Sequence, residues 1–190
     1  MIKILHTADW HIGQFNGPIV NGENARFKDI CKCLDVLVEK AKEQKPDFII
    51  FAGDMFHQAR VWSDRGLKES QTAIGYIREL EKVAPVVIVR GTPNHDSDEQ
   101  YKMLKTAFDG DDSVTICTKP ETVNKISYSG KHITVAALPG FDRGYFRAKM
   151  PGLDKSEENE IFTQNIDTLI KGLKAQCTAD VPSVLVTHYT

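Results

Sequence analysis

Two short apolar runs without polar alternation stand out in the first half of the chain. They cover residues 48–52 and 86–89, and such runs are typical of strands buried on both faces. Around them, apolar positions recur at helical spacing over 25–45 and over 63–80, where Ser63 is the predicted N-cap. With a further strand at 2–5, this alternation favours a largely parallel sheet with helical connections.

The second half of the chain carries shorter elements of both kinds. Its predicted order is helix 101–108, strands 114–117, 123–128 and 132–137, helix 156–175 and strand 184–188. Ser129-Gly130 separates the second and third of these strands, which indicates an antiparallel hairpin. The periodicity alone therefore predicts a mixed α/β domain.

Composition narrows the class of protein but not its substrate. The chain has 190 residues, 41% of them hydrophobic, which is enough for a single domain over 1–190 with a sizeable core. A net charge of −2 does not demand a polyanionic partner. Binding of nucleic acid would therefore depend on local positive charge or on bound metal.

The cysteines and the N-terminus bear on the compartment. The four cysteines, Cys31, Cys33, Cys117 and Cys177, are too scattered for a disulfide framework, and we expect buried free thiols in a reducing cytosol. The N-terminus lacks the apolar core of a signal peptide, and no stretch approaches about 20 apolar residues. A cytoplasmic protein without a membrane partner is the resulting expectation.

Residues that can bind metal ions stand at the ends of four predicted strands. These segments are Asp9-Trp10-His11, Gly53-Asp54, Asn94-His95-Asp96 and His188. Each alone is ordinary, since a turn, a helix cap or a hydrogen-bonded histidine accounts for it. Because the carboxyl ends of neighbouring strands converge on one crevice of an open α/β sheet, we expect the four segments to meet. Asp, His and Asn together suit Mn²⁺, Fe²⁺ or Zn²⁺ better than Ca²⁺ or Mg²⁺.

The succession of these segments resembles the calcineurin-like metallophosphoesterases. Within that family, the chain is similar to the SbcD-type DNA repair nucleases in residues 6–13, Arg26-Phe27, residues 52–57 and Ala137-Leu138-Pro139. Their eukaryotic counterpart is the nuclease of the double-strand-break repair complex. The similarity covers nearly the whole chain, and it implies a four-layered α/β/β/α sandwich with mixed sheets.

The resemblance also implies roles for the site residues. The implied ligands are Asp9 and His11 for a first metal ion, Asn94 and His188 for a second, and Asp54 as a bridge between the two. Two cations held about 3.5–4 Å apart make a shared water acidic enough to attack phosphorus near neutral pH. His95 would be the catalytic histidine, donating a hydrogen bond or proton toward the leaving oxygen. Asp96 would either orient His95 or cap the following helix.

Two departures from the family pattern stand out. The family usually has Gly directly before Asn-His, whereas Gly91-Thr92-Pro93 precedes Asn94 here, so this turn must be built differently. The family also supplies further histidines from a Gly-His-x-His segment after the strand of His188, and this chain ends at Thr190. We therefore expect a domain incomplete at its C-terminus, whose activity as a 190-residue chain is weak or absent.

Four further residues are candidates for substrate binding. His57 extends the loop of Asp54 and would contact DNA or lie near the metals, with a structural role as an equal alternative. Arg143, Tyr145 and Arg147 belong to a segment rich in basic and aromatic residues, 141–149. Such a segment suits contacts with phosphates and stacking on the bases of a single strand. A solvated loop with a few packed rings is the alternative for this segment.

The resemblance implies a manganese-dependent nuclease that hydrolyses DNA phosphodiester bonds, as an exonuclease and as an endonuclease. Mn²⁺ is the expected metal, with Fe²⁺, Zn²⁺ and Mg²⁺ as alternatives. The implied partners are DNA, an SbcC-type coiled-coil ATPase and a second copy of the chain. Two rivals stay open: a phosphatase or cyclic-nucleotide phosphodiesterase with the same ligands, and a noncatalytic metal-stabilised module that binds DNA or an ATPase.

Overall fold

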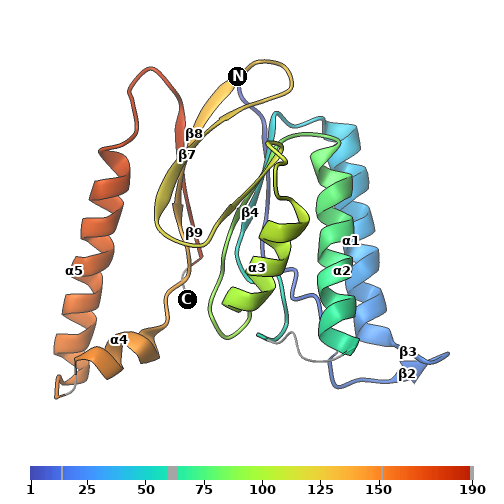
Figure 1. Cartoon of the computed structure of the whole chain (residues 1–190), viewed down its shortest axis with the longest axis horizontal. Coiled ribbons are helices and arrows are strands. Elements are labelled where there is room, and N and C mark those ends of the chain that lie inside the picture. The colour runs from blue at the N-terminus through green and yellow to red at the C-terminus, as the bar shows by residue number, and fades with distance from the viewer. Residues whose placement is uncertain (14, 60–63, 151, 189–190) are drawn as a thin grey trace.

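The computed structural model describes residues 1–13, 15–59, 64–150 and 152–188, without the side chains of residues 64, 65 and 145. Ser63, the predicted helix cap, lies outside the described residues. Two sheets pack face to face in the middle of the molecule, and helices cover the outer face of each (Figure 1). The predicted four-layered α/β/β/α arrangement is confirmed.

The first sheet is wholly parallel, as predicted for the first half of the chain. Its strands lie in the order β1 (Ile4–Thr7), β4 (Phe48–Ala52), β5 (Val86–Val89) and β6 (Val114–Cys117). The helices α1 (Ala25–Gln44), α2 (Asp64–Glu81) and α3 (Asp98–Ala107) connect these strands. All the carboxyl ends of this sheet therefore lie at one edge.

Only the second sheet is mixed. It contains β7 (Glu121–Ile126), β8 (His132–Leu138) and β9 (Ser183–Thr187), with β7 antiparallel and β9 parallel to β8. The helices α4 (Arg143–Lys149) and α5 (Lys155–Lys174) lie between β8 and β9 in the chain. Residues 143–149 thus form a helix, and the alternative of a solvated loop for this segment is wrong.

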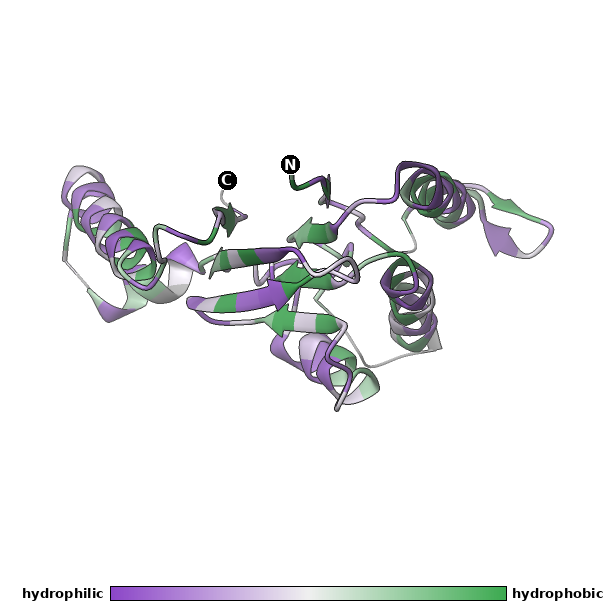
Figure 2. Ribbon diagram, turned by 90° about the horizontal axis from the view of Figure 1, so that it is seen from above, coloured by the Kyte–Doolittle hydropathy of each residue, from purple (hydrophilic) through white to green (hydrophobic). Residues whose placement is uncertain are grey.

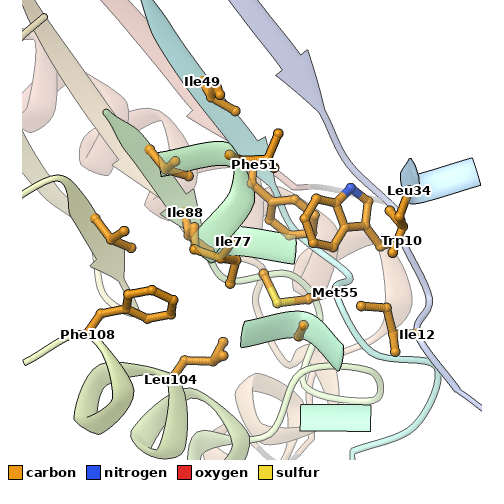
Figure 3. Close-up of a cluster of buried hydrophobic side chains, with 14 of the residues drawn as sticks. Trp10, Ile12, Leu34, Ile49, Phe51, Met55, Ile77, Ile88, Leu104 and Phe108 are labelled. Carbon is orange, nitrogen blue, oxygen red and sulfur yellow. The ribbon is translucent and has the colours of Figure 1, made fainter. Parts of the chain in front are cut away.

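The apolar runs of the sequence are buried on both faces because they lie between two layers. Ile50 and Val87 face the second sheet, where they pack against Val135 and its neighbours. Ile49 and Ile88 face the helices instead, in the cluster drawn in Figure 3. Figure 2 shows hydrophobic stretches on strands in the centre and many hydrophilic residues on the helices.

Local capping sets the helix boundaries. The side chain of Asn24 accepts a hydrogen bond from Phe27 N at the start of α1, directly after a short hairpin of β2 (Ile19–Val20) and β3 (Glu23–Asn24). Ser97 and Gln100 form a capping box, so α3 begins three residues earlier than predicted. Its polar first turn carries no apolar periodicity, which is why the pattern placed the start at residue 101.

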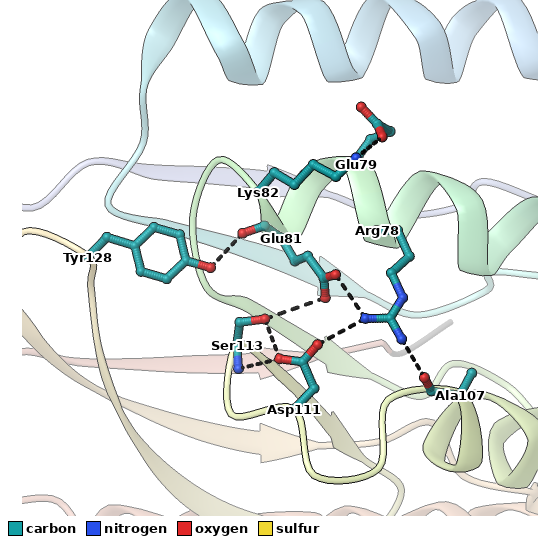
Figure 4. A network of polar contacts seen from close by, with 8 residues as sticks. All are labelled: Arg78, Glu79, Glu81, Lys82, Ala107, Asp111, Ser113 and Tyr128. Atoms are coloured by element: carbon teal, nitrogen blue, oxygen red, sulfur yellow. Dashed lines mark hydrogen bonds and ion pairs between the residues drawn. The ribbon is translucent and has the colours of Figure 1, made fainter.

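A polar network ties the layers together at the amino ends of the strands. Arg78 of α2 donates to Glu81, to Asp111 and to the carbonyl oxygen at the end of α3 (Figure 4). Tyr128, in the turn between β7 and β8, donates to the carbonyl of Glu81. This network fixes the hairpin of the second sheet against the helices of the first, on the side away from the predicted metal ligands.

The structure bears on two of the expectations about the compartment, one on the cysteines and one on membrane-spanning helices. All four cysteines are free thiols and Cys117 is buried, as expected, but Cys33 is exposed, so the expectation of a buried thiol is wrong for Cys33. In the described part of the chain, each helix is too short or too polar to cross a membrane.

Candidate metal centre

The loops after β1 and β4 run side by side at the carboxyl edge of the first sheet. Asp9 N donates to Gly53 O at 3.0 Å, His11 N donates to Asp54 O at 3.1 Å, and Ile12 N continues the pairing. These bonds hold two ligand-bearing loops in register although they are far apart in the sequence.

The backbone at these ligands adopts an uncommon conformation. Asp9, His11 and Asp54 have φ values of 55°, 46° and 56°, and they are three of five non-glycine residues with positive φ in the described ranges. Such conformations are uncommon for residues other than glycine and cluster at functional sites, where the surrounding structure enforces them. The hydrogen bonds between the two loops provide that enforcement.

The buried carboxylate of Asp54 lies at the centre of the cluster. Its Oδ1 accepts hydrogen bonds from the backbone N and the Oγ1 of Thr92, at 2.7 and 3.0 Å. Its Oδ2 lies 3.2 Å from His188 Nε2 and 3.9 Å from His95 Nε2. One oxygen is therefore held by Thr92, while the other faces two imidazoles.

Backbone carbonyls orient both imidazoles. His188 Nδ1 lies 2.7 Å from Ala52 O, and His95 Nδ1 lies 2.7 Å from His57 O. Because a carbonyl oxygen only accepts, Nδ1 carries the hydrogen, and the neutral ring has its lone pair at Nε2. Metal-binding histidines are typically oriented in this way, with the second ring nitrogen donating to a carbonyl or carboxylate.

Two buried ring nitrogens fit bound cations. His188 Nε2 and His11 Nδ1 are buried without a hydrogen-bond partner. The 3.2 Å approach of His188 Nε2 to Asp54 Oδ2 is close enough for an ion pair, yet it makes no hydrogen bond. An unpaired buried nitrogen costs about 1–3 kcal/mol, and two electron-rich atoms facing each other need a positive charge. A divalent ion meets both needs, so the residues present fit the predicted metals.

The remaining ligand candidates gather around this pair. The donor atoms of Asp9, His11 and Asp54 all lie within 4.8 Å of one another, and those of His11, His57 and His95 form a second such group. His11 belongs to both groups, and its ring lies edge-on to that of His95, with centroids 4.6 Å apart. The sequence clusters thus meet at one edge of the fold.

The sequence model of a family described as calcineurin-like phosphoesterase matches residues 2–174. The chain belongs to the calcineurin-like phosphoesterase family. Membership agrees with the fold and indicates metal-dependent hydrolysis of phosphoesters, for which this family typically binds two divalent ions. The match includes every predicted ligand except His188, which follows it in the chain.

Asn94 shares a turn with His95 in this phosphoesterase, where it is exposed and its carbonyl accepts from Ala59 N at 3.1 Å. The assignment of Asn94, like those of the other ligands, stays a prediction.

Asp96 is fully buried and holds the Asp54 loop. Its carboxylate accepts hydrogen bonds from the backbone N of Asp54, Phe56 and Gly91 and from the hydroxyl of Tyr101. Burial raises the pKa of Asp96, and these donors oppose that shift.

Neither of the two roles considered for Asp96 matches its hydrogen bonds. Ser97 caps α3, so the alternative of a helix cap is wrong. The ring of His95 is oriented by the carbonyl of His57, and the hydrogen bonds of Asp96 go to the Asp54 loop and Tyr101. Asp96 thus acts on the position of the ligand loop.

The candidate substrate residues fall into two groups. His57 lies in the histidine cluster, with its ring 3.8 Å from that of Phe15. Arg147 makes a two-point ion pair with Glu158 of α5, at 2.7 and 3.1 Å, and Arg143 stacks over a ring of the same helix. The described contacts of these arginines therefore join α4 to α5. The side chain of Tyr145 lies outside the described residues.

The structure places beside the site two residues to which the sequence assigned no role. A cavity of about 680 Å³ adjoins Asp9 and His11, and Arg26 of α1 lines one of its walls. Thr92 contacts Asp54 directly. From the sequence, Thr92 was named only within a departure from the family pattern and Arg26 only within a motif. No contact with the site was predicted for either residue.

Proposed function

We propose that this phosphoesterase is a metal-dependent DNA nuclease of the SbcD type, which acts as an exonuclease and, as a second activity, an endonuclease. The observation that carries the proposal is the approach of His188 and His95 to Asp54 Oδ2, at 3.2 and 3.9 Å, beside Asp9 and His11. This arrangement supports phosphoester hydrolysis. The choice of DNA is supported by the similar motifs and by the cavity beside the ligands.

The proposed metal site uses carboxylate, imidazole and amide donors, a set that suits Mn²⁺ best and also accommodates Fe²⁺ or Zn²⁺. Bound ions would neutralise the phosphate and acidify water. The residues that would hold them are Asp9, His11, Asp54, Asn94 and His188.

His95 is well oriented for proton donation to the leaving oxygen. In the protonated ring, Nδ1–H remains bonded to His57 O, and Nε2 carries a second N–H on the side of Asp54. Because the first bond fixes the ring plane, the second donor is directed into the site.

The neighbouring cavity supports a nucleotide substrate over a bare phosphate. About 680 Å³ is within the usual range for sites that hold small organic ligands. Its lining includes the aromatic ring of Phe15 and the guanidinium of Arg26, which suit a base or sugar and a phosphate respectively. DNA extending from the scissile phosphate would occupy this cavity.

The full-length protein tests the proposal, assayed with Mn²⁺ on duplex ends, hairpins and a small phosphodiester. Cleavage of DNA that a chelator abolishes supports it, whereas activity on the small ester alone rejects it. Arg26→Ala should raise the KM for DNA and leave the small ester unaffected. His95→Ala should abolish cleavage, a change to which a noncatalytic module would be indifferent.

The proposed partners follow from the same resemblance. We propose a coiled-coil ATPase of the SbcC type, DNA, and a second copy of the chain, in the cytoplasm. The exposed side chains of Val36 on α1 and Leu67 on α2 are compatible with dimerisation through these helices. Sedimentation of Val36→Asp against the unmodified protein tests the dimer, which this charge should dissociate.

A further inference from the structure

Thr92 forms hydrogen bonds with two segments of the site, through both its backbone and its side chain. Both its backbone N–H and its hydroxyl donate to Asp54 Oδ1, at 2.7 and 3.0 Å, across 38 residues of sequence. Its own carbonyl oxygen accepts from the backbone N of His95 and of Asp96, at 3.0 and 2.8 Å. One residue therefore connects the central carboxylate with the turn that presents His95.

The neighbours of Thr92 restrict its position. Gly91 has no room for a side chain, because a Cβ there would lie 2.1 Å from Asp54 N. Pro93 restricts the preceding backbone to extended conformations, and a β-branched side chain has few rotamers. The hydroxyl of Thr92 is thus presented to Asp54 by a backbone with little freedom.

We infer that Thr92 is a positioning residue for metal binding, whose hydroxyl holds the Asp54 carboxylate so that Oδ2 faces His188 and the metal ions. The inference rests on the metal site of the proposed function. With two hydrogen bonds on Oδ1, the carboxylate plane is fixed before metal arrives. With the backbone bond alone, the carboxylate can rotate relative to the two imidazoles beside it, and metal binding must then restore its orientation.

The test compares variants at residue 92 by calorimetric titration with Mn²⁺. Thr92→Val keeps the shape and removes the hydroxyl, and Thr92→Ser keeps the hydroxyl. A hydrogen bond to a charged group is strong enough for Thr92→Val to weaken binding by about tenfold, and Thr92→Ser should stay within about threefold. The control is Thr168→Val on α5, whose hydroxyl donates to Gln164 O of the same helix; its Mn²⁺ affinity should be unchanged.

A purely structural role would give a different result. In that case Thr92→Val would lower the melting temperature measured in chelator, with an unchanged dissociation constant for Mn²⁺, and the inference would be overturned. If Thr92→Val does not fold, Thr92→Ala and Thr92→Ser provide the comparison, since they differ in the hydroxyl alone. Equal Mn²⁺ affinity of that pair would also overturn the inference.

The readout separates this inference from the proposed function. Full-length wild-type protein that binds Mn²⁺ without cutting DNA would contradict the nuclease proposal, and the affinities of the Thr92 variants would still decide the role of the hydroxyl. Conversely, DNA cleavage together with equal affinities would refute the role of Thr92 alone.

Discussion

Glycines at the ligand loops set how closely the site residues approach one another. A Cβ at Gly53 would lie 2.4 Å from His188 Cγ, and one at Gly91 would lie 2.1 Å from Asp54 N. Both neighbours are held by other bonds, so neither can move away cheaply. The close packing of the metal site is therefore specified by residues that are not themselves predicted metal ligands.

Gly91→Ala should disturb the packing of the metal site. The added methyl displaces the Asp54 backbone, which we expect to lower the free energy of unfolding by about 1–3 kcal/mol and to weaken Mn²⁺ binding more than tenfold. Gly75→Ala is the matched control, because its Cβ would meet nothing within 4 Å on helix α2. The control should gain about 0.5–1 kcal/mol. Urea unfolding and calorimetry measure both effects, and normal Mn²⁺ affinity of Gly91→Ala would contradict the packing described.

Removal of the His188 side chain and removal of the His95 side chain should have different effects on Mn²⁺ binding. His188 Nε2 is buried beside Asp54 without a hydrogen-bond partner, so His188→Ala should weaken Mn²⁺ binding at least tenfold. His95→Ala should retain binding while the intact protein loses cleavage. Titration and cleavage assays on both variants distinguish these roles, and strong metal loss in His95→Ala would show that His95 is a ligand instead.

Thiol reactivity tests whether reagents in solution can reach the space between the two sheets. Burial raises the pKa of Cys117 to about 12, and its side chain lies between the two sheets. At pH 8 a maleimide should modify exposed Cys33 within minutes and spare Cys117 until the protein unfolds. Mass spectrometry of labelled peptides measures this order. Equal labelling of the two cysteines would contradict the packing of the sheets.

Among the secondary-structure elements, those with a strong apolar pattern were predictable. The β4 and β5 strands match their predicted bounds because burial on both faces excludes polar residues. The hairpin of β2 and β3 was missed, since two-residue strands with exposed side chains leave no pattern. Helix α4 was missed as an element because its contacts are polar and aromatic ones with α5, which no local spacing reveals.

The polar network of α2 predicts a pH dependence of stability. The hydroxyl and backbone N–H of Ser113, with Arg78 nearby, hold the pKa of Asp111 below its ordinary value. A lowered folded-state pKa gives stability that is present above the unfolded value, about 3.9, and lost as pH falls through the folded value. The melting temperature of Asp111→Asn should therefore lie below wild type at pH 6, and the gap should narrow below pH 4. A gap independent of pH would contradict this role for the carboxylate.

In the molecule as a whole, the predictable part of the site was the set of residues that strand ends bring together. Asp9, His11 and Asp54 follow parallel strands, so topology alone implies that they meet. The contact of Thr92 with Asp54 joins two loops through side-chain orientation, which periodicity does not encode. The guanidinium of Arg147 was expected at phosphate, but the opposite charge of Glu158 holds it against α5.

Anomalous scattering from crystals of the chain soaked in Mn²⁺ tests the central claim most directly. Data collected at the manganese edge should give a peak bound by Asp54 Oδ2 and His188 Nε2, and a second peak on the side of Asp9 and His11. Anomalous density only at other surface carboxylates, with this cluster empty at saturating Mn²⁺, would contradict the account.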